Sequence, residues 1–424
     1  MREIKIINYL KKEVFQLSRS LGGKNNILTL VKIKKILKNL KLKKIKSGKK
    51  IFDWVVPKTW ELSDAYIKDE KNRKIIDAKN NFLHILNYSI SINKKITKKE
   101  LFKNLYFLKN KPNAIPYVTS YYKKKWGFCI KYSDKKKFTS SKYKVYIKSS
   151  FSNKGLDYGE FFLKGKSRKE ILFSTYICHP SLGNDNFSGL IMSTLIANYV
   201  SKINRKYSYR FIFIPETIGS LYYIKKNLFK LQKKLIAGYV LTCLGKGKEF
   251  NILSKYKDNL SYNFLINFFS KNKVKYKYRE WSLRGSDERQ FSSPNVNLPF
   301  TLITRDKFLD YKEYHTSLDN IDLIKNSHLL KNFIYFKKFI NFIESEDIYL
   351  SQFKGEPFLS KRNLYSNITS SYKKNKDQDL IINVLDYCDG KNSVNDIINK
   401  LNYNSKKIVS IIKILVKHKL VSKI

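Results

Sequence analysis

Between residues 166 and 348 the chain alternates apolar runs of strand length with segments of helical periodicity. Nearly continuous apolar strands separated by helices are typical of a parallel sheet that is covered on both faces. The sequence therefore predicts an α/β core with a mostly parallel sheet. The expected strands are 171–177, 209–215, 235–243 and 299–304, and the expected helices are 187–203, 218–231, 257–271 and one near 325–345.

A β-rich segment separates this core from the N-terminal residues. Residues 1–50 show two helical patterns, and we assign them to the core together with residues 166–348. The segment 51–165 has short strand-like runs, one of them beginning at His84. Alternation of Val145, Ile147 and Phe151 with polar neighbours predicts a half-buried antiparallel sheet. We therefore expect residues 51–165 to form a β-rich inserted domain.

The last part of the chain, residues 349–424, has three short helical patterns followed by Leu420-Val-Ser-Lys-Ile. Ser393 with Asp396 forms a capping-box pattern, and Ser405 is a second predicted N-cap. This order predicts a winged-helix domain. Such a domain binds DNA or serves in packing and dimerisation. The even spread of lysines marks no recognition face, so we favour the structural use.

Composition limits the partners of the chain. The 424 residues carry a net charge of +51, but the lysines lie in almost every segment. We therefore favour a generally basic surface and keep nucleic acid as the alternative.

The four cysteines form no CxxC pair, which favours a reduced, intracellular chain. No apolar run approaches the ~18 residues that cross a bilayer, so we expect a cytoplasmic protein without membrane insertion and leave homo-oligomer formation open.

Two of the five histidines lie where an α/β sheet presents ligands. His179 follows the first strand and Asp185 lies six residues on, in a Gly/Asn-rich turn; His315 lies beyond a later strand. Zinc favours imidazole nitrogen and carboxylate oxygen, so these three residues are candidate zinc ligands. Glu216 closes another strand, where a carboxylate could take a proton from water and pass it to a leaving amine.

Charged residues of later loops are candidates for supporting roles. Asp287 could orient a ligand histidine, and Arg284 or Arg289 could bind a substrate carboxylate. We place Glu288 and Asp319 with them, as residues that orient the ligands or contact substrate.

Several motifs together resemble a known family, although each alone is weak. They are Phe52-Asp-Trp-Val-Val-Pro-Lys-Thr-Trp, Asp64-Ala-Tyr-Ile-Lys-Asp, Pro116-Tyr-Val-Thr-Ser-Tyr-Tyr, Trp126-Gly-Phe-Cys, Cys178-His-Pro-Ser, Gly285-Ser-Asp-Glu-Arg-Gln-Phe and Tyr314-His-Thr-Ser-Leu-Asp-Asn. Nearly the whole chain resembles a bacterial aminopeptidase-like family, often linked to polysaccharide biosynthesis, in the zinc aminopeptidase and glutamate carboxypeptidase superfamily. The resemblance implies a phosphorylase/hydrolase-like peptidase core, a β-rich insertion and a C-terminal winged helix.

The resemblance also implies ligand roles and exposes gaps. In the superfamily two zinc ions share an aspartate, matched by Asp185, while His179 and His315 each match a ligand of one ion. The superfamily also has two consecutive glutamates, of which the first acts as the base and the second as a metal ligand. If Gly219 sets the alignment, this pair matches Glu216 and Thr217, so Glu216 is the base and the ligand is lost. In the other alignment the pair matches Pro215 and Glu216, so Glu216 is the ligand and the base is lost.

A later strand of the superfamily ends in a further acidic ligand, and here Thr242 or Cys243 stands at that position. Cys243 could bind zinc as a thiolate, but we favour a buried structural cysteine. One zinc therefore fits these residues better than two, and a metal-free protein stays open.

The sequence leaves three functions open. The first is a metal-dependent aminopeptidase-like hydrolase of peptide or amino-acyl amide bonds, in which zinc and Glu216 activate water. The second is a catalytically degenerate peptidase fold that acts as a binding or assembly protein in polysaccharide biosynthesis. The third is a nucleic-acid-binding regulator that uses the winged helix.

Overall fold

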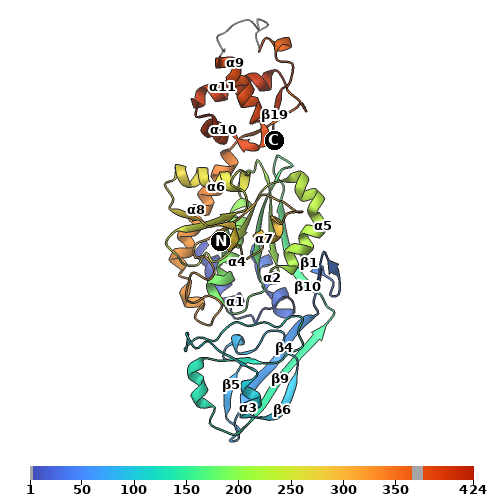
Figure 1. Cartoon of the computed structure of the whole chain (residues 1–424), viewed down its shortest axis with the longest axis vertical. Coiled ribbons are helices and arrows are strands. Elements are labelled where there is room, and N and C mark those ends of the chain that lie inside the picture. The colour runs from blue at the N-terminus through green and yellow to red at the C-terminus, as the bar shows by residue number, and fades with distance from the viewer. Residues whose placement is uncertain (1–2, 365–375) are drawn as a thin grey trace.

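The protein, described as a computed structural model over residues 3–364 and 376–424, has three parts arranged along one axis (Figure 1). A small β-sheet lies at one end, the large α/β core lies in the middle, and a small helical domain lies at the other end. Among the described residues, no helix combines the length and apolar character that a bilayer span needs.

The core is built on an eight-stranded sheet. Its strands, in spatial order, are β1 (Lys41–Ile45), β10 (Leu156–Leu163), β12 (Ser208–Ile214), β11 (Glu170–Tyr176), β13 (Leu235–Leu241), β16 (Phe300–Thr304), β14 (Phe250–Ser254) and β15 (Tyr276–Tyr278). The four central strands β12, β11, β13 and β16 pair in parallel with one another, as the buried apolar runs predict. Antiparallel pairings of β1, β10 and β14 make the sheet mixed as a whole.

Helices cover both faces of this sheet. One face carries α1 (Glu3–Val14), α2 (Lys24–Ile36), α4 (Gly189–Val200), α6 (Leu260–Lys271) and α8 (Asn326–Ser345), which share one apolar cluster. The other face carries α5 (Ile218–Lys234) and the short α7 (Glu288–Phe291), whose cluster continues into the inserted segment through residues such as Trp60 and Ile147. The helix predicted at 257–271 begins later because the side chain of Asn259 caps it by accepting the N–H of Tyr262 at 3.1 Å.

The inserted segment forms an antiparallel sheet in the order β5-β4-β9-β6. These strands are β5 (Lys74–Asp77), β4 (Thr59–Lys68), β9 (Lys142–Ser152) and β6 (Ile92–Thr97). Its smaller elements are β2 (Lys50–Ile51), β3 (Trp54–Val55), α3 (Lys98–Phe102), β7 (Leu105–Tyr106) and β8 (Phe128–Cys129). Val145 and Ile147 are buried as predicted, whereas Phe151 is 39% exposed near the end of β9.

Two expectations for the inserted segment need correction. Strand β10 lies within the range 51–165 that we assigned to the insertion, but it pairs with β1 and β12 of the large sheet. The strand expected from His84 is absent from the described residues, since 82–84 form a 3-10 turn. The side chain of Asn81 caps this turn by accepting the N–H of Leu83 at 2.9 Å.

The C-terminal part is a winged helix with its own apolar core. It contains β17 (Ile348–Ser351), α9 (Lys376–Asp386), β18 (Asp389–Ser393), α10 (Val394–Leu401), α11 (Ser405–Lys417) and β19 (Val421–Lys423), with strand order β18-β17-β19. The predicted capping box of Ser393 and Asp396 is confirmed. The second N-cap is Asn404 and not Ser405, because the Asn404 side chain accepts the N–H of Lys406 at 2.9 Å.

Candidate metal centre

The loop after β11 places His179 and Asp185 at the carboxyl edge of the sheet. Both side chains are buried, and the loop passes through a cis peptide bond between Asp185 and Asn186. The carboxylate of Asp319 accepts the backbone N–H groups of Asn184 at 2.5 Å and of Asp185 at 3.0 Å. Asp319 is fully buried, so its effect is to fix the loop that carries Asp185.

His315 reaches the same point from the loop after β16. Its Nε2 lies 2.8 Å from Oδ2 of Asp185, and its ring stacks on Tyr314 with centroids 3.9 Å apart. The inserted segment supports this loop, because the N–H of Tyr117 donates to the carbonyl of His315 at 2.8 Å. The ring of Tyr117 lies 5.3 Å from those of both His179 and His315. Tyr117 is a neighbour of the site that we did not single out from the sequence.

The three side chains fit a zinc ion. The ligand atoms of His179, Asp185 and His315 all lie within 4.8 Å of one another. The Nε2 atom of His315 is buried and has no hydrogen-bond partner of suitable geometry among the described residues. Burial lowers the pKa of His179 to about 4, which keeps the imidazole in the neutral, ligating form. Two imidazoles and a carboxylate, with one position left for water, are the donor set of a catalytic zinc site.

Asp185 is ionised in this setting. Burial acts to raise its pKa, but the neighbouring His179 and His315 together with the hydroxyl of Tyr176 lower that pKa to about 2. Tyr176 donates its hydroxyl to Oδ1 of Asp185, which leaves Oδ2 facing the histidines. A charged carboxylate beside two imidazoles is ready to receive a cation.

Glu216, at the end of β12, brings its carboxylate to the same group of side chains. Its Oε2 lies 3.9 Å from Nε2 of His179, and the hydroxyl of Ser286 donates to its Oε1 at 3.0 Å. Burial, together with the negative charges of Asp287 and Asp185, raises the pKa of Glu216 well above its usual range. A carboxylate with a raised pKa binds a proton more readily than a free carboxylate and can return it to a leaving group.

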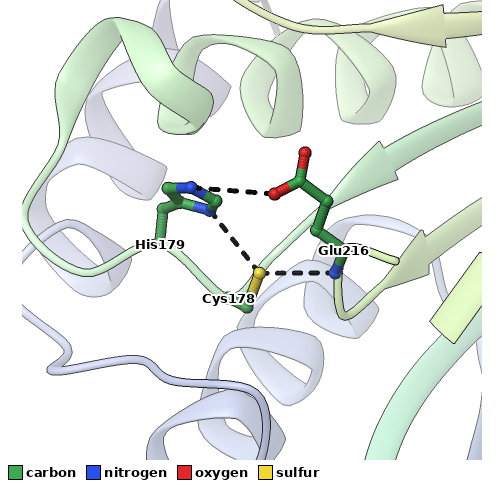
Figure 2. A group of neighbouring side chains, drawn as sticks. All are labelled: Cys178, His179 and Glu216. Atoms are coloured by element: carbon green, nitrogen blue, oxygen red, sulfur yellow. Dashed lines mark hydrogen bonds and ion pairs between the residues drawn. The ribbon is translucent and has the colours of Figure 1, made fainter. Parts of the chain in front are cut away.

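Figure 2 shows a second group of possible ligands around the same histidine, formed by Cys178, His179 and Glu216. The sulfur of Cys178 lies 3.5 Å from Nδ1 of His179, and it accepts the backbone N–H of Glu216 at 3.3 Å. The sequence alone gave Cys178 no role. Its position at a strand end, directly before a candidate ligand, is the signal that could have found it.

The turn after Glu216 has a strained backbone, and Asp287 of another loop stabilises it. Thr217 has φ 64° and ψ −71°, and the N–H of Ile218 donates to the carbonyl of Glu216 at 2.8 Å, which defines a γ-turn. Oδ1 of Asp287 accepts both the N–H of Thr217 and the hydroxyl of Ser220 at 2.8 Å. We expected Asp287 to orient a ligand histidine, but it holds the turn that carries Glu216.

The neighbouring charged residues divide into buried and exposed ones. Oε1 of Glu288 accepts the N–H groups of Gly285 at 2.8 Å and Ser286 at 3.2 Å, so this fully buried side chain holds its own loop. Arg289 is exposed and donates to the hydroxyl of Thr217 at 3.3 Å. Of the five supporting residues that we expected, Asp287, Glu288 and Asp319 are fully buried, whereas Arg284 and Arg289 are exposed.

Thr242 and Cys243 directly follow β13, where the family resemblance led us to expect an acidic ligand. Neither residue is acidic. The hydroxyl oxygen of Thr242 lies 2.7 Å from the hydroxyl of Tyr176, which also binds Asp185. Cys243 joins neither group of potential ligands within the described part of the chain, and its sulfur contacts Thr242 and Tyr311. Burial raises the pKa of the Cys243 thiol, which supports its structural role.

Comparisons with known proteins agree with this architecture. The chain is 38% identical over 401 residues to a Clostridium acetobutylicum protein named as a polysaccharide biosynthesis protein with aminopeptidase-like domain, covering 94% of this chain and 92% of that protein. A solved structure from the same species, named as a peptidase, superposes with a TM-score of 0.81 at 36% identity and covers 100% of this chain and 96% of its own.

More distant structures share the fold of the core. The zinc aminopeptidase from Bacillus subtilis gives a TM-score of 0.54 at 14% identity, covering 78% of this chain and 93% of its own. An M28 peptidase precursor from Shewanella amazonensis gives a TM-score of 0.57 at 13% identity, covering 84% of this chain and 94% of its own. The fold is thus that of an aminopeptidase-like α/β protein.

Two family matches divide the chain. Residues 347–423 match the winged helix-turn-helix family. Residues 8–346 match the family described as "Domain of unknown function (DUF4910)", and the chain belongs to this family.

Proposed function

We propose that this chain hydrolyses peptide or amino-acyl amide bonds in a metal-dependent reaction, with one zinc ion held by His179, Asp185 and His315. The observation that carries the proposal is the convergence of three ligand atoms within 4.8 Å, on one carboxylate and two imidazoles, beside the carboxylate of Glu216. We further propose a cytoplasmic location, which the four free, buried cysteines support.

A zinc ion in this position would supply Lewis-acid chemistry, lowering the pKa of water and polarising the amide carbonyl. The protein supplies the proton transfer. Ser286 binds Oε1 of Glu216, so Oε2 is the oxygen that faces His179 and the reacting groups. In the proposed reaction, Oε2 takes a proton from the attacking water and returns it to the leaving amine.

Glu216→Gln tests the role of this carboxylate. The amide keeps the size of the side chain but cannot take a proton, so turnover on an amino-acyl amide panel should fall about 10²- to 10⁴-fold while zinc content is unchanged. Glu249→Gln, which removes a carboxylate paired with Lys277, is the matched control. Loss of zinc in Glu216→Gln would make Glu216 a ligand, and a metal-free, folded wild-type protein that cleaves nothing would contradict the proposal.

A catalytically degenerate binding protein of polysaccharide biosynthesis is the second candidate. Thr217 and Thr242 stand where the superfamily has acids, and the hydroxyl of Tyr176 bridges Asp185 and Thr242. The name of the Clostridium acetobutylicum relative points in the same direction. Saturable binding of an oligosaccharide by metal-free protein, without hydrolysis of any amide, would favour this candidate.

A nucleic-acid-binding regulator is the third candidate, and exposed Lys406, Lys413 and Lys417 of α11 are the feature that supports it. Binding that weakens steeply with salt and shows no sequence preference would reduce this candidate to bulk charge.

A further inference from the structure

Cys178 connects two residues of the proposed reaction through a single sulfur atom. Its side chain is 2% exposed and lies shortly after the end of β11. The sulfur lies 3.5 Å from Nδ1 of His179 and accepts the backbone N–H of Glu216 at 3.3 Å (Figure 2). The contact with Glu216 joins the loop after β11 to the end of β12.

The two nitrogens of His179 face different partners. Nδ1 faces the sulfur of Cys178, whereas Nε2 lies 3.9 Å from both Oδ2 of Asp185 and Oε2 of Glu216. In a neutral imidazole one nitrogen carries the proton and the other carries the lone pair. A proton on Nδ1, donated to the sulfur, leaves the lone pair of Nε2 directed toward the carboxylates.

Histidines that bind metals usually donate their other ring N–H to an oxygen acceptor, which fixes both the tautomer and the ring orientation. A thiol sulfur is a weaker acceptor. Here the hydrogen-bond partner of Nδ1 within the described residues is this sulfur. Cys178 therefore occupies the position from which the orientation of His179 is set.

We propose that Cys178 is a positioning residue, whose sulfur accepts the Nδ1–H of His179 and thereby presents Nε2 to the zinc ion. The same sulfur fixes the backbone of Glu216, so one atom sets the separation of the ligand and the base. This inference rests on the proposed function. Cys178 is not itself a ligand in this arrangement, because the two nitrogens of an imidazole point to different sides of the ring.

The test compares zinc affinity in the full-length wild type, Cys178→Ala, Cys178→Ser and Cys388→Ser. Removal of an oxygen acceptor behind a ligand histidine weakens metal binding about 10- to 100-fold. Because sulfur is the weaker acceptor, Cys178→Ala should weaken zinc binding about 10-fold, at the lower end of this range. Cys178→Ser should recover most of the affinity, because a hydroxyl also accepts from Nδ1–H. Cys388→Ser replaces a buried thiol of the winged helix and should leave zinc affinity unchanged.

Two spectroscopic readouts separate positioning from ligation and from simple destabilisation. Cobalt-loaded wild type should lack the intense sulfur-to-cobalt charge-transfer absorption of a thiolate ligand. Imidazole ¹⁵N spectra of histidine-labelled, zinc-loaded wild type should show His179 protonated at Nδ1, and Cys178→Ala should change that signal.

The outcomes are distinguishable. A charge-transfer band in the wild type that disappears in Cys178→Ser would make Cys178 a ligand and overturn the inference. Equal zinc affinity of Cys178→Ala and wild type would overturn the inference alone, whereas wild type that binds no zinc would overturn the proposed function as well. If Cys178→Ala does not fold, two other measurements test whether Cys178 positions His179 or binds the metal. They are the cobalt spectra of wild type and Cys178→Ser, and the position of the ring proton of His179 in the wild type.

Discussion

Replacing Thr217 by glycine should stabilise the protein while impairing the proposed reaction. Thr217 is a β-branched residue at φ 64° and ψ −71°, in the γ-turn directly after Glu216. Residues with side chains rarely adopt positive φ, and glycine does so without a steric penalty. The turn persists because Asp287 and the hydrogen bond from Ile218 to Glu216 hold it.

The expected gain in the stability of Thr217→Gly is the difference between two opposing effects. Release of the strain at Thr217 contributes about 1 to 3 kcal/mol in favour of the folded state. The greater freedom of glycine in the unfolded chain costs about 0.5 to 1 kcal/mol. The net change in the free energy of unfolding is therefore an increase of about 1 kcal/mol. The looser turn no longer fixes Glu216, so turnover should fall by about 10- to 100-fold.

Urea unfolding of metal-free protein measures the first effect, and hydrolysis of an amino-acyl amide measures the second. Thr217→Ala is the matched control, because it also loses the hydroxyl contact with Arg289 but keeps the Cβ atom and the strain. Thr217→Gly should therefore be more stable than Thr217→Ala. A glycine variant that is less stable than the alanine variant would refute the assignment of strain to this turn.

Two further predictions concern pH and the loop of Asp185. Because Glu216 acts as a base only when ionised, and burial raises its pKa, hydrolysis should fall as pH drops through that raised value. The charge of Arg289 lowers the pKa of Glu216, so Arg289→Gln should move the acid limb of the pH–rate profile upward by less than about one pH unit; an unmoved or lowered limb would contradict this. Asp319→Asn places an amide N–H against a backbone N–H of Asn184 or Asp185, which removes a hydrogen bond to the loop. Thermal melting should therefore show that the free energy of unfolding falls by about 1 to 3 kcal/mol, and titration should show weaker zinc binding. Unchanged melting and affinity would show that Asp319 does not fix the loop.

The central part of the fold could be predicted because its strands are buried on both faces. Strands β11, β12 and β13 are buried along their whole length, so their apolar runs are continuous and easy to recognise. Strand β1, with the sequence Lys-Leu-Lys-Lys-Ile, is mostly exposed and has no such pattern. Its partner β10 lies more than a hundred residues along the chain, so no local signal could place the two strands in the large sheet.

The sequence indicated those residues of the candidate site that lie just after a strand. His179, Asp185 and Glu216 follow central strands, and parallel strands bring their carboxyl ends to one edge. Contacts between distant loops carried no such signal. Tyr117, from the inserted segment, and Asp287, which binds the turn after Glu216, depend on where those loops return in space.

The proposed metal binding by His179, Asp185 and His315 can be tested by measuring the zinc content of purified protein. The wild type, His179→Ala and His315→Ala would be loaded with zinc, freed of excess metal and analysed by mass spectrometry for zinc per chain. We predict about one zinc per wild-type chain and loss of this zinc in both variants, because each variant removes one of three protein ligands. A folded wild type without zinc, or variants that retain the full wild-type content, would contradict the assignment of this site.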